Sequence, residues 1–379
     1  MNREDISIKA IEEAKKHKCV VLELPTGYGK TKTTIDIIKS HGKKMSVLLV
    51  VAQVVHKKNW QNEIDKWGGL SGCEITCDCY QSLKNHVDKE YDIVILDEGH
   101  HLSDLRKLYL QKIKINNNVI VLSATISKEL KDWLRLEYDT RIIKETLQSA
   151  IQNDVLPEPE IILYPMKIED NGKTELYVKN PKMSPVARVE YDDLSKIIYR
   201  RDVRIECEMT RTQYLKQLNS DIDFWRGTTM RGNHWAKNYW LSLAGARLKW
   251  LAGLKEEFVK KLLDGELKHK RTLTFCSSIE QTEVLGSNSI NSKKKGCQET
   301  IDLFNDHLIN HITACDMLNE GVSLVDCQYG ILVKLNSSDR ITTQRIGRIL
   351  RHNDPKIIIP YFVDTREEEI VEKLIDKKI

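Results

Sequence analysis

The sequence contains no apolar stretch that approaches the roughly 18 to 20 residues a transmembrane helix needs. Its opening segment, MNREDISIKAIEEAKKHK, is charged throughout and is unlike a secretory signal. The net charge of the 379 residues is only +4, which is too balanced to indicate a nucleic-acid binder by itself. We therefore expect an intracellular protein without a membrane segment, in which any basic surface is local.

The cysteine pattern does not support a disulfide framework. Nine cysteines is an odd number, and several lie in apolar stretches such as CVVLEL and TLTFCSS, where a reduced thiol packs as a small hydrophobic side chain. Cys73, Cys77 and Cys79 form the only cluster, and its spacing lacks the fourth ligand of a zinc site. We interpret these thiols as structural.

Short apolar runs alternate with amphipathic stretches in two separate parts of the chain. The first set lies at 19–24, 46–51, 74–80, 92–96 and 119–122, and the second at 272–276, 311–314, 329–335 and 356–363. Continuous apolar strands separated by helical patterns are typical of parallel sheets that are covered on both faces. The sequence therefore predicts an α/β fold with two parallel-sheet domains in tandem, at 1–148 and 251–379.

The segment 149–250 between these domains has a different pattern. Five of the eight prolines lie between 156 and 185, which predicts a crossover and a small irregular subdomain. From residue 191 to about 264 the periodicity is helical, and we find no strand-like run there. We expect a mainly helical accessory segment.

The first chemical motif follows the apolar run CVVLEL. The sequence PTGYGKT and the helical pattern KTTIDIIKSHG come next, so a strand, a glycine-rich turn and a helix N-terminus would present backbone N–H groups to phosphates. Leu24 occupies the position at which this loop pattern usually begins with glycine. Lys30 would neutralise the β and γ phosphates, and Thr31 would coordinate magnesium. The candidate nucleotide-binding residues of the loop are Thr26, Gly27, Tyr28, Gly29, Lys30 and Thr31.

The second motif is the apolar run YDIVIL, which ends in two adjacent carboxylates, Asp97 and Glu98. Open α/β sheets bind ligands at the carboxyl ends of their strands. We assign Asp97 as a magnesium ligand and Glu98 as the general base that deprotonates the attacking water. An exposed acidic pair in a turn is disfavoured, because these residues follow both a phosphate loop and a buried strand.

With these motifs the chain resembles superfamily 2 helicases of the DEAH-box type. LPTGYGKT resembles motif I, and DEGH resembles motif II with Gly99 in place of the usual alanine or cysteine. Ser123-Ala124-Thr125 matches motif III, and QRIGRILR at 344–351 fits motif VI. The resemblance implies two RecA-like domains that bind ATP and Mg²⁺ in the cleft between them.

The resemblance also implies roles for individual residues. Arg348 and Arg351 would be arginine fingers, and their spacing of three places them on one face of a helix. Gln344 would lie near the γ-phosphate or the attacking water. The nucleotide-contacting and coupling residues carried over from the other motifs are His100, Ser123, Thr125 and, in motif V, Gly321. That motif departs from the family pattern at Cys315 and Ser323, which replace a threonine and an acid or amide.

The branch of the family is indicated by VVAQVVHKKNWQNEIDKW, which resembles motif Ia and its helix in the UvsW-like phage helicases and the Swi/Snf-like translocases. These proteins act mostly on DNA. We therefore predict an ATP-dependent nucleic-acid helicase or translocase that is monomeric and prefers DNA to RNA. A protein-remodelling ATPase, or one stimulated by nucleic acid without strand separation, is the alternative, and a non-enzymatic clamp is disfavoured by the complete set of catalytic residues.

A nucleic-acid contact is predicted in the middle of the chain. Between residues 196 and 250 there are eleven Lys and Arg, five Asp and Glu, and four of the seven tryptophans. Basic charge follows a phosphate backbone, and aromatic rings stack on bases. The candidate contacts are Arg226, Arg231, Trp235 and Lys237. Tryptophans at helical spacing also pack in cores, so the segment is either a binding surface or a scaffold.

Overall fold

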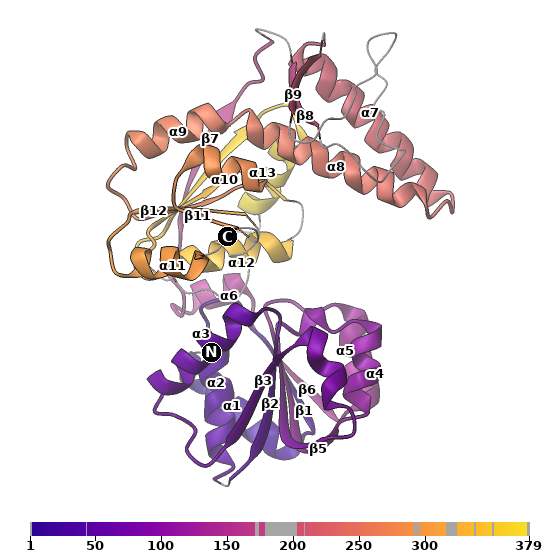
Figure 1. The fold of residues 1–379 in the computed structure, drawn as a ribbon, viewed down its shortest axis with the longest axis vertical. Helices are drawn as coiled ribbons and strands as arrows, with labels where there is room; N and C mark the ends of the chain where they lie inside the picture. The colour runs from indigo at the N-terminus through magenta and orange to yellow at the C-terminus, as the bar shows by residue number, and fades with distance from the viewer. Residues whose placement is uncertain are drawn as a thin grey trace.

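The computed structural model describes residues 2–42, 44–170, 174–178, 203–207, 209–291, 294, 296–315, 324–336, 339–350 and 352–376. It contains two α/β domains, which lie one above the other in Figure 1, the first in indigo to magenta and the second in orange to yellow. A pair of long helices projects from the second domain. The prediction of two RecA-like domains in tandem is confirmed.

The first domain is built on a parallel six-stranded sheet with the order β3-β2-β4-β5-β1-β6. Its strands are β1 (Cys19–Glu23), β2 (Ser46–Val51), β3 (Glu74–Cys79), β4 (Glu90–Asp97), β5 (Lys114–Ser123) and β6 (Thr140–Lys144). Its helices are α1 (Arg3–Lys16), α2 (Lys30–Ser40), α3 (Val54–Lys66), α4 (Asp104–Gln111), α5 (Lys128–Glu137) and α6 (Leu147–Gln152), with the 3₁₀ turns η1 (Tyr80–His86) and η2 (Gly99–His101).

Strand β1 shows why this sheet is covered on both sides. All five of its residues are buried. Val20 and Leu22 join the apolar cluster under α1 and α2, whereas Cys19 and Val21 join the cluster under α4 and α5. Successive side chains of a strand point to opposite faces, so an uninterrupted apolar run requires helices on both.

The second domain repeats this design in a parallel sheet with the order β11-β12-β10-β13-β14-β7. Its strands are β7 (Glu160–Met166), β10 (Thr272–Phe275), β11 (Ser289–Ile290), β12 (His311–Ala314), β13 (Tyr329–Leu332) and β14 (Lys356–Phe362). Its helices are α9 (Glu256–Asp264), α10 (Ile279–Leu285), α11 (Cys297–Asn305), α12 (Asp339–Ile349) and α13 (Arg366–Asp376). Each of the predicted apolar runs of both domains forms a strand.

Two strands differ from the sequence interpretation of the intervening segment. β7, which we placed in the crossover, is the edge strand of the second sheet and pairs with β14 along its whole length. β8 (Thr174–Val178) pairs antiparallel with β9 (Val203–Cys207), although we expected no strand after residue 191. The helical prediction failed there because pairing with a strand distant in sequence overrides a local pattern.

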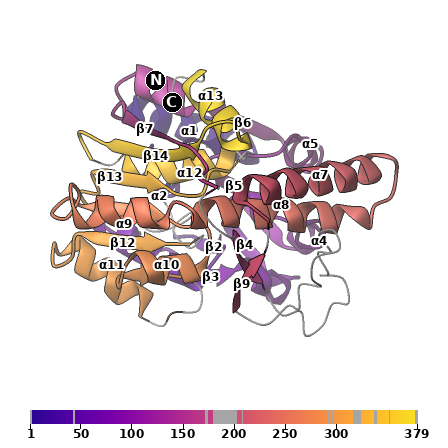
Figure 2. The same cartoon turned by 90° about the horizontal axis from the view of Figure 1, so that it is seen from above.

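The remainder of the intervening segment forms an antiparallel helical hairpin of α7 (Arg211–Met230) and α8 (Ala236–Gly253). Its base packs on the second domain, where Tyr214, Leu218 and Trp250 surround Phe362 at the end of β14. The hairpin extends sideways from this base, toward the side of the molecule on which α4 and α5 lie (Figures 1 and 2). Within the described residues, no helix is both long and apolar enough to cross a membrane.

The cysteine cluster at 73, 77 and 79 lies at one edge of the first sheet. Cys73, Cys77 and Cys79 are reduced and lie on or beside β3, an edge strand of the first sheet. Burial raises the pKa of the Cys77 thiol to about 11, so it stays protonated at neutral pH. Among the described residues, no group of three or more His, Cys, Asp or Glu is arranged to hold a metal ion.

Candidate active site

The loop from Leu24 to Thr31 leaves the carboxyl end of β1 and enters α2 in a conformation that needs glycine. Gly27 and Gly29 have φ angles of +86° and +103°, which residues with a Cβ rarely adopt. Gly29 is also the N-cap of α2, and because it has no side chain it offers no capping hydrogen bond to the first turn of this helix. The N-terminus of α2 therefore faces an adjoining cavity with N–H groups and the positive end of the helix dipole, which suits a phosphate.

The side chains of this loop divide into two groups. Lys30 folds back over the loop and donates through Nζ to the carbonyl of Leu24 at 2.9 Å. Lys30 and Thr31 both line the cavity. Tyr28, which we counted among the nucleotide-binding residues, is only 1% exposed and packs in the core under α1 and α2. Its ring is therefore withdrawn from the cavity.

Asp97 ends β4 at the same edge of the sheet, and only β5 lies between β4 and β1, the strand that carries the phosphate loop. Its carboxylate Oδ2 accepts a hydrogen bond of 2.8 Å from the indole Nε1 of Trp60, a buried residue of α3. Its carbonyl accepts one of 3.0 Å from the hydroxyl of Tyr80. Sequence reasoning missed Trp60, although the segment that contains it had been noted for its resemblance to motif Ia.

Glu98, His100, Ser123 and Thr125 form a continuous chain of contacts next to Asp97. His100 Nδ1 lies 3.4 Å from Glu98 Oε2 and 3.2 Å from Ser123 Oγ. Ser123 Oγ donates to the Thr125 carbonyl at 2.8 Å. Glu98 itself is buried and has a positive φ of +51°, a strained backbone conformation for a residue with a side chain. The structure thus connects the residues of motif II directly with those of motif III.

Gly99, the departure from the family motif, has a steric explanation. A Cβ added at this residue would lie 2.3 Å from Cγ1 of Val121 on β5, well inside contact distance. Val121 therefore occupies the space that the alanine or cysteine of the family pattern would need. The change in motif II reflects packing against β5 and leaves Asp97, Glu98 and His100 in place.

Helix α12 brings motif VI to the first domain. Gly347 packs directly on the phosphate loop, because a Cβ added there would lie 2.7 Å from Cβ of Thr26. The next residue, Arg348, is buried and lines the cavity. Arg345 instead points into its own domain, where it donates to the Lys334 carbonyl at 3.1 Å and lies over the Phe275 ring.

For three of the predicted site residues, the structure does not describe the side chain or the whole residue. Arg351 and Gly321 lie outside the described residues. Gln344 belongs to α12, but its side chain is outside the described part. Their assignment stays a prediction.

These groups surround one cavity of about 980 Å³. It is lined by the phosphate loop, Asp97 and Glu98 from the first domain, by 151 and 154–158 from the connecting segment, and by α11 and Arg348 from the second. Arg3, another residue that sequence reasoning missed, joins these parts, since its Nη2 donates to the carbonyls of Gly27 and Val155, both at 3.1 Å. A nucleotide bound in this cavity would contact both domains at once.

The oxygen atoms that line this cavity suit a magnesium ion as ligands. Thr31 and Asp97 offer a hydroxyl and a carboxylate oxygen, and Mg²⁺ prefers oxygen ligands and completes its shell with waters and phosphates. Only Oδ2 of Asp97 is used by Trp60. A metal ion here would bind the other carboxylate oxygen.

The candidate nucleic-acid residues lie away from this cleft, on the α7–α8 hairpin. Arg226, Arg231, Trp235 and Lys237 are all exposed. The tryptophans of the segment divide between the two expectations. Trp250 is buried at the base of the hairpin, whereas Trp235 is 55% exposed near its tip. The α7–α8 hairpin therefore has a base that packs as a scaffold and an exposed surface near its tip.

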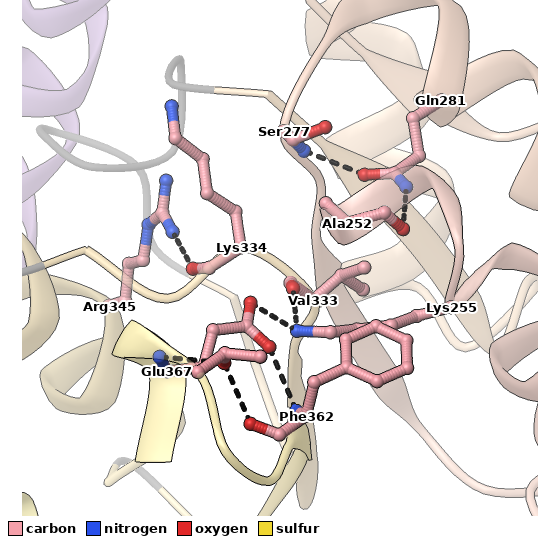
Figure 3. A network of polar contacts seen from close by, with 10 residues as sticks. Ala252, Lys255, Ser277, Gln281, Val333, Lys334, Arg345, Phe362 and Glu367 are labelled. Carbon is pink, nitrogen blue, oxygen red and sulfur yellow. Dashed lines mark hydrogen bonds and ion pairs between the residues drawn. The ribbon is translucent and has the colours of Figure 1, made fainter. Parts of the chain in front are cut away.

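The hairpin is fastened to the second domain by a buried ion pair. Lys255, which follows α8, is fully buried, and its Nζ lies 2.6 Å from Oε1 of Glu367 and donates to the Val333 carbonyl at 3.0 Å (Figure 3). Glu367 Oε2 also accepts from the backbone N–H of Phe362 at 3.0 Å. Burial lowers the pKa of Lys255, and the carboxylate of Glu367 opposes that shift.

A nucleotide-binding cleft of this kind defines a class of protein, the ATP-hydrolysing enzymes with two RecA-like domains. Comparison with known proteins identifies the same class. The model for the type III restriction enzyme res subunit matches residues 3–128, and the model for the helicase conserved C-terminal domain matches residues 254–353. The DNA 3'-5' translocase XPB2 of Sulfurisphaera tokodaii is 23% identical over 382 aligned positions, which cover 94% of this chain and 80% of that protein.

Two solved structures share the fold. The Hef helicase domain of Pyrococcus furiosus superposes with a TM-score of 0.54 at 13% identity, over 98% of this chain and 97% of that one. The ATP-dependent Type ISP restriction-modification enzyme LlaBIII bound to DNA superposes with a TM-score of 0.55 at 13% identity. The match covers 97% of this chain but only 28% of that enzyme.

Each matched range contains most strands of one sheet, β1–β5 in the first and β10–β13 in the second, and together the two ranges hold the motifs that meet at the cleft. The chain thus contains two helicase-type domains. It is an ATP-hydrolysing enzyme of the helicase and translocase type.

Proposed function

We propose that this chain is a DNA helicase or translocase of the DEAH-box type, close to the UvsW-like and Swi/Snf-like branches, and that it acts as a monomer. The observation that carries the ATPase mechanism is the contact of α12 with the phosphate loop, which brings Arg348 to the cavity that holds Lys30 and Glu98. The preference for DNA is supported by the printed name of the S. tokodaii relative, a DNA translocase. Sedimentation of the purified protein tests the monomer.

In the proposed mechanism the residues of both domains position ATP and a water. Thr31 and Asp97 would hold magnesium, which neutralises charge on the phosphate oxygens when bound. Lys30 binds the β and γ phosphates, and Glu98 accepts the proton of the attacking water. Arg348, with Arg351 and Gln344 as its proposed partners, stabilises the charge that develops on the γ-phosphate.

The coupling of hydrolysis to movement is proposed to pass through motifs II and III. His100 contacts both Glu98 and Ser123, so a change at the γ-phosphate reaches the loop after β5 through Ser123 and Thr125. Because Arg348 belongs to the second domain, loss of the γ-phosphate removes an attraction between the two domains. Cleft opening and closing then moves the second domain along a bound strand.

The substrate assignment is tested by ATP hydrolysis with single-stranded DNA, duplex DNA, forked DNA and RNA. We expect DNA to stimulate hydrolysis more strongly than RNA. Stimulation by RNA alone would reverse the DNA assignment, and a rate unchanged by every nucleic acid would favour a protein-remodelling ATPase.

The catalytic assignments are tested by Lys30→Ala and Glu98→Gln. Lys30→Ala should weaken nucleotide binding and abolish turnover with an unchanged circular dichroism spectrum. Glu98→Gln keeps the shape of the base but cannot take a proton, so ATP should still bind while hydrolysis falls by roughly 10²-fold or more. Glu283→Gln, a change at an exposed acid of α10 outside the cavity lining, serves as the control and should keep hydrolysis. Loss of ATP binding in Glu98→Gln would show that the two motif II carboxylates are assigned wrongly.

The nucleic-acid contact of the hairpin is tested by replacing Arg226, Arg231 and Lys237 together with Gln. Each lost phosphate contact should flatten the salt dependence of single-stranded DNA binding by about 0.7. The matched control replaces three exposed lysines of the second domain that lie outside the hairpin, Lys260, Lys268 and Lys270. An unchanged slope, or an equal loss in the control, would mean that the hairpin makes no specific phosphate contact.

A further inference from the structure

The end of the hairpin carries a cluster of four aromatic side chains, which we call the aromatic tip: Phe224, Trp225, Trp235 and Tyr239. Trp225 and Tyr239 stack on each other with ring centroids 4.9 Å apart and an interplanar angle of 19°. Trp235 meets both of these rings edge-on, at 5.5 and 5.6 Å. Phe224 meets Trp225 edge-on at 5.2 Å. The inner pair therefore supports two outer rings in a fixed arrangement.

The outer rings of the aromatic tip are open to solvent. Phe224 is 61% exposed and Trp235 is 55% exposed, and the neighbouring Met230 is 70% exposed. The buried apolar packing of the hairpin is centred on Trp250 and Phe362 and reaches Ile222 and Trp240 beside the inner pair, but it does not include Phe224 or Trp235. A grouped set of exposed aromatic rings that takes no part in this packing is typical of a surface that contacts a partner.

The charge around the aromatic tip indicates the chemistry of that partner. The sequence contains no Asp or Glu between Asp223 and Glu256. Arg226, Arg231 and Lys237 are exposed in this interval. A partner that offers flat apolar faces together with negative charge is a nucleic acid with unstacked bases, since aromatic rings stack on bases of any sequence.

The attachment of the hairpin determines how the aromatic tip moves. Lys255 and Glu367 form their buried ion pair directly after α8, and Glu367 also holds the backbone of Phe362, on which the hairpin base packs (Figure 3). Such contacts join the hairpin rigidly to the second domain. A displacement of that domain during the ATPase cycle is therefore carried to the aromatic tip, at the far end of the hairpin (Figure 1).

We infer that the aromatic tip separates strands: Phe224 and Trp235 stack on the terminal base at the junction between duplex and single strand and hold it out of the duplex. This inference rests on the proposed action on DNA and assigns strand separation to the hairpin. The inner pair of Trp225 and Tyr239 supports the two stacking rings. The basic side chains beside them bind the phosphates of the displaced strand.

The experiment uses a forked DNA duplex with 2-aminopurine at the first base pair of the fork, and it measures fluorescence on binding and base pairs opened per ATP hydrolysed. Phe224→Ala/Trp235→Ala should lose the fluorescence change and open roughly 10-fold fewer base pairs per ATP, as expected when stacking contacts are removed. Phe224→Tyr/Trp235→Tyr keeps flat rings and should stay within about 2-fold of wild type, because base stacking tolerates different aromatic rings. Leu241→Ala removes another exposed apolar side chain of the hairpin and is expected to behave as wild type.

Three results would overturn the inference. One is an unchanged number of base pairs opened per ATP in the double alanine variant. Another is an equal loss in Leu241→Ala, which would show a general effect of the hairpin surface. The third is a wild-type protein whose hydrolysis is stimulated by DNA but which opens no fork, and here the proposed function would stand. Absence of any stimulation by DNA would refute the proposed function and this inference together.

Discussion

Replacement of Gly347 by alanine tests whether the two domains must meet closely at motif VI. The added Cβ would lie 2.7 Å from Cβ of Thr26 and 3.3 Å from its carbonyl oxygen. Carbon atoms in contact are normally separated by about 3.5 to 4.0 Å, so α12 has to withdraw by roughly 1 Å. Cβ of Thr26 cannot rotate away, because its position is set by the backbone of the buried loop.

The withdrawal displaces Arg348, the next residue along α12, from the phosphate loop. A misplacement of about 1 Å in a catalytic group can cost on the order of 10²-fold in rate, and we expect a fall of this size in kcat for ATP. The stability of the fold should change little, because the overlap lies between domains and a small opening relieves it. Alanine is also a better helix former than glycine by about 1 kcal/mol, which offsets part of any strain.

The measurement is steady-state ATP hydrolysis with thermal melting of the same samples. Gly245→Ala is the matched control, because this glycine also lies in a helix and an added Cβ has no atom within 4 Å. A kcat within 2-fold of wild type in Gly347→Ala would refute the close approach of motif VI to the phosphate loop. A fall in melting temperature that explains the loss of activity would refute the placement of the overlap between the domains.

Three further changes test other contacts. Gly99→Ala should destabilise the first domain by about 1–3 kcal/mol because its Cβ overlaps Val121, and Val121→Ala in the same chain should restore part of the loss in a denaturant melt. Trp60→Phe keeps a ring but removes the N–H that holds the motif II aspartate, so nucleotide affinity should fall in the presence of magnesium and change much less in EDTA; equal losses in both conditions would contradict this role. Lys255→Met leaves the carboxylate partner buried and unpaired, which should cost about 3–5 kcal/mol of unfolding free energy, and replacing both members of the pair with apolar residues should recover most of it.

The sequence by itself determined the features that are local. A phosphate loop is one continuous piece of chain, a strand, two glycines with positive φ and a helix N-terminus, so PTGYGKT could be interpreted without knowledge of the rest of the fold. The same holds for Asp97 and Glu98 at the end of β4, and for the apolar runs that form both sheets. Strands buried on two faces leave a clear pattern because most of their residues must be apolar.

Only the tertiary structure decided which distant residues meet. Trp60 of α3 reaches Asp97 at the end of β4, and Arg3 reaches the carbonyls of Gly27 and Val155. No spacing along the chain predicts either contact. β7 belongs to the second sheet because it pairs with β14, whose Lys356 lies 196 residues from Glu160. Tyr28 lies in the phosphate loop by sequence but in the core by packing. Side-chain direction and long-range pairing depend on how all the elements fill space together, and a local pattern does not contain that information.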